Sequence, residues 1–402
     1  MQAVLLAAGR STRFWPLGNG EHKSVYTIAG RPLLLHTLHS LAKTGLIDEA
    51  FVVHAPNFSV PRIVPERIGS MKVACVQQTE PKGTGDALYC VSEHITGDFV
   101  LVWPDMVNAD FFVRSLVRPA KKQGVRAAML GAPTKAPWNF GIIRKDDEFV
   151  REVVEKPVLG SEPSSIKRVG VELLPKEFLS VYESLPEHHE TDLVDALNRY
   201  AQKNDILLIE QKHDVPVLKY PWDVFTQMNV LSRSFSGWAQ RNAKHPAYIT
   251  VSKQSVIEGR CEFGKDVMLR GAVYIGEGSV IGEGTQIIGP AFLERKTIIG
   301  SGCKIARSSV GEGATVCNNT QLEDSIVATG CRVGEECIVQ GRLGDRSVIE
   351  ARGQSGEIIV TGRTQLGVVM GKESVLGKGC RVEPGVMVDI QSVIEDNTRL
   401  VV

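Results

Sequence analysis

The sequence has no net charge, because its 46 basic residues balance its 46 acidic residues. A chain without a basic excess cannot hold a nucleic acid or an anionic membrane by charge alone, so neither partner is expected. Long apolar runs are also missing, since the apolar start Met1–Ala8 meets Arg10 and Arg13 at once. That start is too short for a signal peptide and far too short to span a bilayer, and we interpret it as a first strand.

Two residue types are missing from places where chemistry would need them. None of the eight cysteines belongs to a C-x-x-C pair, which in a chain without a secretion signal indicates reduced thiols in a cytoplasmic compartment. All nine histidines lie at or before His245. A histidine base is therefore excluded from the remainder of the chain.

The first part of the chain alternates short apolar runs with helical patterns. This alternation predicts βαβ units and a mainly parallel sheet with helices on both faces, whose ligands lie at the carboxyl ends of the strands. The expected elements are Ala3–Ala7, Leu33–Ala42, Ala50–His54, Asp86–His94, Phe99–Trp103 and Ala127–Leu130.

After Pro246 the sequence becomes a repeat of six residues. This period predicts a three-sided β-helix, in which each repeat forms one face and its turn. The repeating apolar residues are Ile257, Phe263, Leu269, Ile275, Ile281 and Ile287, and later Met370, Leu376, Val382, Val388, Ile394 and Leu400. A break near Arg352–Thr364 indicates a loop that leaves the coil. Five cysteines share the small inward position of the repeat, which explains them by packing: Cys261, Cys303, Cys331, Cys337 and Cys380.

A loop of small residues with two arginines follows the first strand, in the order Leu6-Ala7-Ala8-Gly9-Arg10-Ser11-Thr12-Arg13. Small residues let backbone N–H groups approach a triphosphate, and Arg13 adds a planar fork that matches phosphate oxygens. The residues alone leave a simple packing turn open as the alternative.

Together with Lys23 and the segment Gly30-Arg31-Pro32-Leu33, this loop resembles the signature of the sugar nucleotidyltransferases. The family pattern is L-A-A-G-x-G-T-R-x-x-P-L, followed by a lysine and a G-K-P-L-like segment. The resemblance implies that Arg13 and Lys23 are catalytic. It implies nucleotide binding by Leu6, Ala7, Ala8 and Gly9. Ser11 stands where the family has its second glycine.

The segment Gln78–Ala87 resembles the part of the family that recognises the base. By this resemblance Gln78 binds the base edge, and Gly83 and Thr84 line the base pocket. A side-chain amide offers one donor and one acceptor, which suits uracil and thymine equally well. Both UTP and dTTP therefore remain open.

The resemblance also implies a magnesium site with two aspartate ligands. Asp105 follows an apolar run where the family has Gly-Asp, with Pro104 in place of the glycine. Asp223, in Tyr220-Pro221-Trp222-Asp223, resembles an archaeal variant of the second metal segment. Two carboxylates and phosphate oxygens are ligands that Mg²⁺ prefers.

Three further residues resemble the sugar-binding segments of the family. Gly141 would allow close backbone approach, Glu155 would accept hydrogen bonds from sugar hydroxyls, and Lys156 would face the sugar phosphate. Arg168 stands where the family has an asparagine that touches the sugar. The segment Glu190-Thr191-Asp192 is interpreted as scaffold.

The resemblance thus implies an α/β, Rossmann-like domain over residues 1–230 that transfers a nucleotide from UTP or dTTP to a sugar-1-phosphate, either N-acetylglucosamine-1-phosphate or glucose-1-phosphate. A linker helix over residues 231–248 and a left-handed β-helix over residues 249–402 are expected to follow. The flat apolar sides of such solenoids favour a homo-oligomer, here a trimer.

This architecture resembles the bifunctional uridylyltransferase and acetyltransferase family, particularly its archaeal form. Asn318 stands where that family has the histidine base of acetyl transfer, and asparagine cannot accept the proton. The β-helix is therefore expected to serve assembly or regulation. Two alternatives remain: a bifunctional enzyme with residual acyl transfer, and a non-catalytic subunit that binds a nucleotide or a sugar.

Overall fold

The structure is a computed structural model that describes residues 1–18, 20–80, 82–235 and 245–402. These residues form two compact units. The first combines Met1–Arg10 with Leu33–Val217, and the second combines Ser11–Pro32 with Leu218–Val402. The domain bounds expected from the sequence, 1–230, 231–248 and 249–402, stay a prediction. The expected linker helix over residues 231–248 falls largely outside the described residues.

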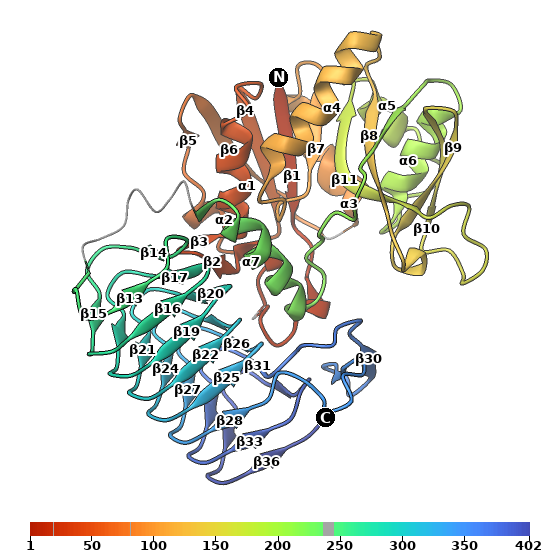
Figure 1. Ribbon diagram of the computed structural model, residues 1–402. Coiled ribbons are helices and arrows are strands. Elements are labelled where there is room, and N and C mark those ends of the chain that lie inside the picture. The colour runs from red at the N-terminus through yellow and green to blue at the C-terminus, as the bar shows by residue number, and fades with distance from the viewer. Residues whose placement is uncertain (19, 81, 236–244) are drawn as a thin grey trace. The chain divides into compact units, whose positions relative to one another are not determined.

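The first unit is built on a ten-stranded sheet in the order β5-β6-β4-β1-β7-β11-β8-β12-β10-β9 (Figure 1). Its strands are β1 (Gln2–Ala7), β4 (Glu49–His54), β5 (Arg67–Ile68), β6 (Met71–Gln77), β7 (Phe99–Val102), β8 (Ala128–Pro133), β9 (Gly141–Asp146), β10 (Phe149–Glu155), β11 (Ile166–Leu174) and β12 (Leu207–Glu210). The sheet is mixed, whereas the sequence predicted a mainly parallel sheet. Strands β6, β4, β1 and β7 run parallel, whereas β11 lies antiparallel between β7 and β8 and the β9–β10 hairpin adds two antiparallel strands.

Helices pack on both faces of this sheet, as predicted. They are α1 (Leu33–Ala42), α2 (Val60–Ile63), α3 (Thr84–Tyr89), α4 (Ala109–Gln123), α5 (Phe178–Glu183) and α6 (Asp192–Ala201), with short 3₁₀ turns at Ser92–His94 and Pro137–Asn139. Helices α1 and α4 pack together, while α3, α5 and α6 share one core cluster with the sheet (Figure 1). Helix α6 buries residues at spacings of three and four, namely Leu193, Ala196, Leu197, Tyr200 and Ala201. This stripe is what an amphipathic helix requires to cover a sheet.

The parallel strands end at one edge of the sheet. His54 is paired with Ala7 of β1 and with Gln77 of β6, and Val102 of β7 is paired with Leu5. Residues that directly follow β1, β6 and β7 therefore emerge at the same carboxyl edge, where ligands of such sheets bind.

The second unit contains three parallel sheets wound from short strands (Figure 1). The first comprises β13 (Thr250–Val251), β16 (Met268–Arg270), β19 (Gln286–Ile288), β22 (Lys304–Ala306), β25 (Gln321–Glu323), β28 (Ile338–Val339), β33 (Arg381–Val382) and β36 (Arg399–Leu400). The second comprises β14 (Val256–Ile257), β17 (Val273–Ile275), β20 (Ala291–Leu293), β23 (Ser309–Val310), β26 (Ile326–Val327), β31 (Val369–Met370) and β34 (Met387–Val388). The third comprises β15 (Glu262–Phe263), β18 (Val280–Ile281), β21 (Ile298–Ile299), β24 (Thr315–Val316), β27 (Arg332–Val333), β32 (Val375–Leu376) and β35 (Val393–Ile394).

The predicted six-residue repeat is confirmed as a parallel β-helix, consistent with the left-handed form. Ile257 pairs with Ile275, which lies eighteen residues or three repeats further on, and Ile275 pairs with Leu293. Four of the five inward cysteines are buried and Cys261 is half-buried, and all eight cysteines are free thiols. Packing therefore accounts for these cysteines.

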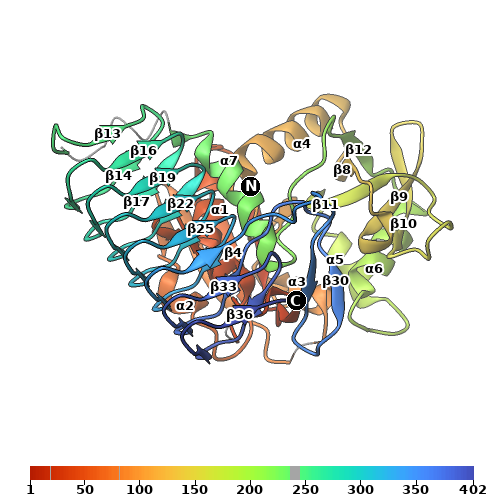
Figure 2. The same cartoon turned by 60° about the horizontal axis from the view of Figure 1, so that its bottom comes forward.

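The β-helix is interrupted once, where the repeat breaks in the sequence. After β28 the chain leaves the coil, forms the antiparallel hairpin β29 (Glu350–Arg352) and β30 (Ile358–Val360), and returns at β31, which pairs with β26 (Figure 2). The predicted break at Arg352–Thr364 lies in this segment. We call residues 341–366 the insertion.

The second unit also holds the N-terminal loop Ser11–Pro32 and helix α7 (Val224–Ser232). The loop contains 3₁₀ turns at Thr12–Phe14 and Lys23–Val25 and the two-residue strands β2 (Thr27–Ile28) and β3 (Arg31–Pro32). Another 3₁₀ turn, Pro221–Asp223, leads into α7. Among the described residues, no helix combines the length and the apolar character that crossing a membrane requires.

Candidate active site

The first strand ends in the small residues that the sequence singled out. Ala7 and Ala8 are buried, whereas Gly9 is exposed directly after the strand. Leu6 pairs with Val53 on the neighbouring strand β4. Gly9 therefore brings the backbone to the surface at the carboxyl edge of the sheet.

Gln78 follows β6 at the same edge and is held in one orientation. Its backbone N–H donates to the His54 carbonyl at 2.8 Å. Its side-chain Nε2 donates to the Gly83 carbonyl at 3.1 Å and to Asp86 Oδ2 at 2.7 Å. Because a carboxylate only accepts, the amide nitrogen must face Asp86, and Oε1 is the atom that can serve a ligand.

The base segment rests on the scaffold that the sequence indicated. Glu190 packs closely against Gly83. A side chain at Gly83 would crowd the Cα atom of Glu190. Asp192 is fully buried, and its Oδ1 accepts from the backbone N–H of Gly85 at 3.2 Å. Its Oδ2 accepts from the Tyr182 hydroxyl at 2.9 Å. Asp192 thereby fixes the start of α3 beside Gly83 and Thr84.

Asp105 lies just beyond β7, and its side chain is buried. The residues before it are tied to neighbouring elements: the Trp103 N–H donates to the Gly170 carbonyl at 3.0 Å, and the Thr37 hydroxyl donates to the Pro104 carbonyl at 3.0 Å. Proline stands here where the family has glycine, and its backbone carbonyl accepts a hydrogen bond. Asp105 is placed at the same sheet edge as Gly9 and Gln78.

The three predicted sugar residues lie together on the β9–β10 hairpin. Gly141 pairs directly with Glu155 across the strands. A Cβ atom at Gly141 would stand 3.0 Å from Glu155 Oε2 and 3.9 Å from Arg168 Cβ. Lys156 follows, with its Nζ 3.3 Å from Glu155 Oε1. Gly141 is buried, and a side chain there would crowd the carboxylate of Glu155.

Arg168 belongs to a buried ion pair next to this group. Its Nε donates to Glu172 Oε1 at 2.7 Å, across the bulge that Gly170 creates in β11. Burial raises the pKa of Glu172, and the charge of Arg168 opposes that shift. Arg168 Nη2 and Glu172 Oε2 are both buried without a hydrogen-bond partner among the described residues. The pair thus retains one hydrogen-bond donor and one acceptor that are not satisfied within the described residues.

In the second unit, the N-terminal loop presents Arg13 and Lys23. Ser11 adopts a left-handed backbone with φ 52°, a conformation that favours the glycine of the family pattern. Its hydroxyl accepts from the Lys23 N–H at 3.0 Å and so ties the start of the loop to its middle. Arg13 is exposed, whereas Lys23 donates from Nζ to the Leu218 carbonyl. The serine is therefore a structural part of the loop.

Asp223 lies at the start of α7 with one oxygen already engaged. Its Oδ2 accepts from the backbone N–H groups of Lys219 and Tyr220, both at 2.8 Å. Burial raises the pKa of Asp223, while these N–H groups and the charges of Arg363 and Lys23 lower it. These two bonds fix the orientation of the carboxylate through Oδ2.

The β-helix holds the N-terminal loop through a buried carboxylate. Glu294 Oε1 accepts from the Ala29 N–H and Oε2 from the Gly30 N–H, both at 2.7 Å. Gly30 has φ 72°, and a side chain there would collide with the Tyr274 hydroxyl. Near the start of the loop, Trp15 Nε1 donates to Asp389 Oδ1 at 2.8 Å. The loop that carries Arg13 and Lys23 is therefore anchored on the β-helix at both ends.

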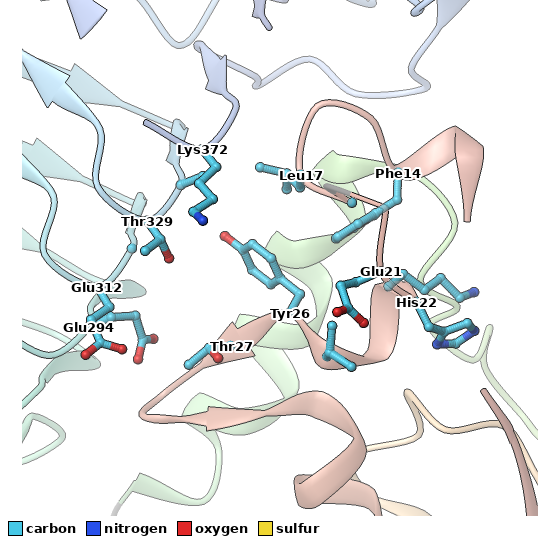
Figure 3. Close-up of a pocket in the computed structure, with 15 residues that line it drawn as sticks. Phe14, Leu17, Glu21, His22, Tyr26, Thr27, Glu294, Glu312, Thr329 and Lys372 are labelled. Atoms are coloured by element: carbon cyan, nitrogen blue, oxygen red, sulfur yellow. The ribbon is translucent and has the colours of Figure 1, made fainter. Parts of the chain in front are cut away.

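A cavity of about 180 Å³ lies between this loop and the β-helix (Figure 3). Figure 3 shows the Tyr26 hydroxyl directed toward Lys372 and Thr329. His22 lines the cavity and is neutral, because burial and the charge of Lys23 lower its pKa to about 3. Other residues that line the cavity include Phe14, Leu17, Glu21, Thr27, Glu294 and Glu312.

The Glu294 anchor is expected to make stability depend on pH. Burial raises the pKa of Glu294 from 4.5 to about 7, although the two N–H groups favour the charged form. When folding raises the pKa of an acid, the folded state binds the proton more tightly than the unfolded state. The acid then stabilises the fold at a pH below its pKa in the unfolded state, and this contribution is lost as the pH rises through its pKa in the folded state. The free energy of unfolding should therefore fall between pH 5 and 8, by at most about 3 kcal/mol from this group.

Denaturant unfolding of the parent and of Glu294→Gln across this range measures the effect. The variant should be less stable at low pH, because its amide faces an N–H donor, and should lose the decrease toward pH 8. Glu283→Gln is the matched control, an exposed carboxylate on another turn of the β-helix. An unchanged pH dependence in Glu294→Gln would refute the anchor as its cause.

Asn318, the counterpart of the acetyltransferase base, has a structural role. Its Oδ1 accepts from the Ser301 N–H at 2.9 Å in the preceding coil. Asp396 makes the same bond to the Lys378 N–H at 2.7 Å. Asn318 is therefore a turn residue that links adjacent coils.

The predicted site residues thus form three groups. Leu6–Gly9, Gln78, Gly83, Thr84 and Asp105 share one sheet edge, and Gly141, Glu155 and Lys156 lie together on one hairpin. Arg13, Lys23 and Asp223 belong to the second unit. Sequence reasoning missed Glu294 and Arg363. A signal for Glu294 existed, since the residue after the inward apolar position is glycine in several repeats, as at Gly276 and Gly300.

Comparison with known proteins covers both parts of the chain. Residues 2–224 match the nucleotidyl transferase family, and residues 269–399 match the GMPPB C-terminal domain. The solved structure of a Bacillus anthracis protein assigned as a glucose-1-phosphate thymidylyltransferase superposes with a TM-score of 0.50 at 17% identity, over 58% of this chain and 95% of that one. At this identity the likeness shows the fold alone.

Two archaeal relatives extend over nearly the whole chain. The bifunctional protein GlmU of Methanococcus vannielii is 24% identical, over 99% of this chain and 94% of that protein. A bifunctional sugar-1-phosphate nucleotidylyltransferase/acetyltransferase of Sulfurisphaera tokodaii is 22% identical, over 96% and 94%. The family match spans more than half of the residues and contains the sheet edge, the loop and Asp223, and the protein therefore belongs to the nucleotidyl transferase family.

Proposed function

We propose that the protein transfers a nucleotide from UTP or dTTP to a sugar-1-phosphate. An oxygen of the sugar phosphate attacks the α-phosphorus, the bond from that phosphorus to the bridging oxygen breaks, and pyrophosphate leaves. The attacking oxygen is anionic at neutral pH, so no general base is needed. Catalysis then consists of positioning the two substrates and neutralising their charge.

The observation that carries this proposal is the arrangement of the phosphate loop. Gly9 exposes its backbone at the sheet edge, and Arg13 follows four residues later, so the chain limits their separation to about 14 Å. Backbone N–H groups near Gly9 would bind the triphosphate, while Arg13 and Lys23 neutralise its charge. We therefore assign Arg13 and Lys23 the catalytic roles and Leu6–Gly9 the nucleotide-binding role.

Gln78 supports a uracil or thymine base. With its Nε2 committed to Asp86 and Gly83, the remaining Oε1 is an acceptor. The N3–H of uracil or thymine can donate to it, whereas cytosine presents an acceptor at N3. Gly83 and Thr84 would line the ring. UTP and dTTP therefore both remain candidates.

Asp105 and Asp223 fit a magnesium ion in the donor type that they offer. Asp223 keeps Oδ1 outside its two backbone bonds, and Asp105 is a carboxylate at the sheet edge. Among the described residues no group of three acidic, histidine or cysteine side chains could hold a metal by itself, so phosphate oxygens would complete the shell. Bound there, Mg²⁺ would supply neutralisation of phosphate charge.

The β9–β10 hairpin is proposed to bind the sugar-1-phosphate. Glu155 would accept hydrogen bonds from hydroxyl groups, Lys156 would pair with the phosphate, and Gly141 would let the ring approach the backbone. N-acetylglucosamine-1-phosphate and glucose-1-phosphate are the expected substrates. The neutral Arg168–Glu172 pair favours a sugar without an acidic substituent, because its charges already cancel.

We propose that the β-helix performs no acetyl transfer, although the Sulfurisphaera tokodaii relative is named for both activities. No histidine lies beyond His245, and Asn318 is used in a turn. Exposed apolar residues on the third sheet, Val280, Ile298 and Val393, support a homotrimer formed through this face. Light scattering measures that state.

The test is pyrophosphate release with Mg²⁺, either UTP or dTTP, and a panel of glucose-, N-acetylglucosamine-, glucosamine- and mannose-1-phosphates. One pairing should release pyrophosphate, and release should stop when EDTA removes the metal. If no pairing releases pyrophosphate while the triphosphate still binds, the protein is a binding subunit and the proposed reaction is wrong.

A further inference from the structure

The insertion of the β-helix places an arginine beside the second metal carboxylate. The Arg363 guanidinium lies over the Phe225 ring, with Cζ 5.3 Å from the ring centroid. Phe225 is in the first turn of α7, two residues after Asp223. Asp223 and Arg363 belong to the same unit, and their charges influence each other. The insertion therefore places the guanidinium of Arg363 at the start of α7.

The charge of Arg363 is not neutralised by a carboxylate of its own. Asp324 is its other acidic neighbour, but both oxygens of Asp324 are bound by Arg307, at 2.7 Å each. Asp223 accepts two backbone N–H groups on Oδ2. Among the described residues no carboxylate forms an ion pair with Arg363, whose Nε donates to the Gln365 carbonyl at 3.3 Å.

Among the described residues, Arg363 is thus a half-buried cation without an ion pair. It lies near Asp223 at the amino end of a nine-residue helix, whose dipole adds positive potential. Partly buried charges are costly unless they are paired, so an anion bound to Arg363 would be stabilised. A polyphosphate has the charge and the several oxygens needed to reach both Arg363 and Lys23.

We propose that Arg363 binds the polyphosphate of the substrate, at the end that leaves as pyrophosphate. This assignment rests on the proposed function and makes the β-helix a part of the nucleotidyl-transfer site. Lys23 approaches the same carboxylate from the N-terminal loop, so two separate segments of the second unit supply the two cations. The insertion then has a function that the regular repeat could not provide, because it reaches α7.

Direct binding of magnesium pyrophosphate and of MgUTP to Arg363→Met tests the proposal by calorimetry. Loss of a charge-assisted hydrogen bond should weaken both about 10-fold or more. Arg363→Lys keeps the charge but loses the planar fork, and should recover part of the affinity. Arg352→Met, an exposed arginine on the same insertion, is the matched control and should bind like the parent.

Binding of Mn²⁺ without nucleotide separates a phosphate contact from a structural effect. Removing a neighbouring cation should leave Mn²⁺ affinity equal or a few-fold tighter, whereas distortion of α7 would weaken it. Unchanged pyrophosphate binding in Arg363→Met overturns the proposal, and so does weaker binding of both pyrophosphate and Mn²⁺. If the parent releases pyrophosphate from UTP but Arg363→Met binds normally, only the role of Arg363 fails. If the parent binds neither probe, the proposed function fails with it.

Discussion

Asp105→Asn should reduce turnover by about 10³-fold, the largest effect that we expect from a single substitution. The change keeps the shape of the side chain but removes its charge at the carboxyl end of β7, where the metal and phosphates would converge. Interactions of a catalytic metal with transferring phosphoryl groups are worth several kcal/mol, and each 1.4 kcal/mol is about a tenfold change in rate. Initial rates of pyrophosphate release measure the loss.

Asp98→Asn is the matched control, because Asp98 precedes the same strand at its opposite end. Its side chain forms a partly exposed ion pair with Arg126, with a distance of 2.5 Å. Such pairs contribute little, so the turnover of this variant should equal that of the parent. Asp105→Asn with parental turnover would remove Asp105 from the proposed metal site.

Lys23→Ala should lower turnover by about 10²-fold or more, the scale seen when one preorganised transition-state donor is removed. The ammonium group is held by the Leu218 carbonyl and lies close enough to Asp223 to influence its charge. It is therefore preorganised to neutralise charge on the triphosphate. Steady-state kinetics at saturating substrates report this loss.

Lys72→Ala, an exposed lysine on β6, controls for the general loss of a positive charge. The thermal midpoint of Lys23→Ala shows whether the loop stays in place without the bond to Leu218. A folded Lys23→Ala protein with near-normal turnover would contradict the catalytic assignment of Lys23.

The repeating parts of the fold could be predicted because each repeat faces the same environment. Ile257 and Ile275 occupy equivalent positions one coil apart, so the six-residue period alone indicates both the strands and their inward faces. The first sheet was less predictable. The order of β11 between β7 and β8 depends on contacts between distant segments, and a short apolar run does not reveal whether its neighbour is parallel.

The proposed site could be located from the sequence where a short motif marks it, as at Gly9, Arg13 and Lys23, whose roles stay predictions. It could not be predicted where the partner is remote. Glu294 lies more than 260 residues from Gly30, and only the fold brings its carboxylate to that N–H. Arg363 lies where the repeat is interrupted, so no period indicates which way its side chain is directed.

The anchoring of the loop also limits how relatives of this protein can be recombined. A chimera joined near residue 245 would combine the loop Ser11–Pro32 of one parent with the β-helix of another. The loop would lose its hydrogen bonds to Glu294 and Asp389, and Asp223 would lose the neighbouring charge of Arg363. Exchange of a working catalytic half therefore requires that the loop, α7 and the coils that hold them be inherited from the same parent.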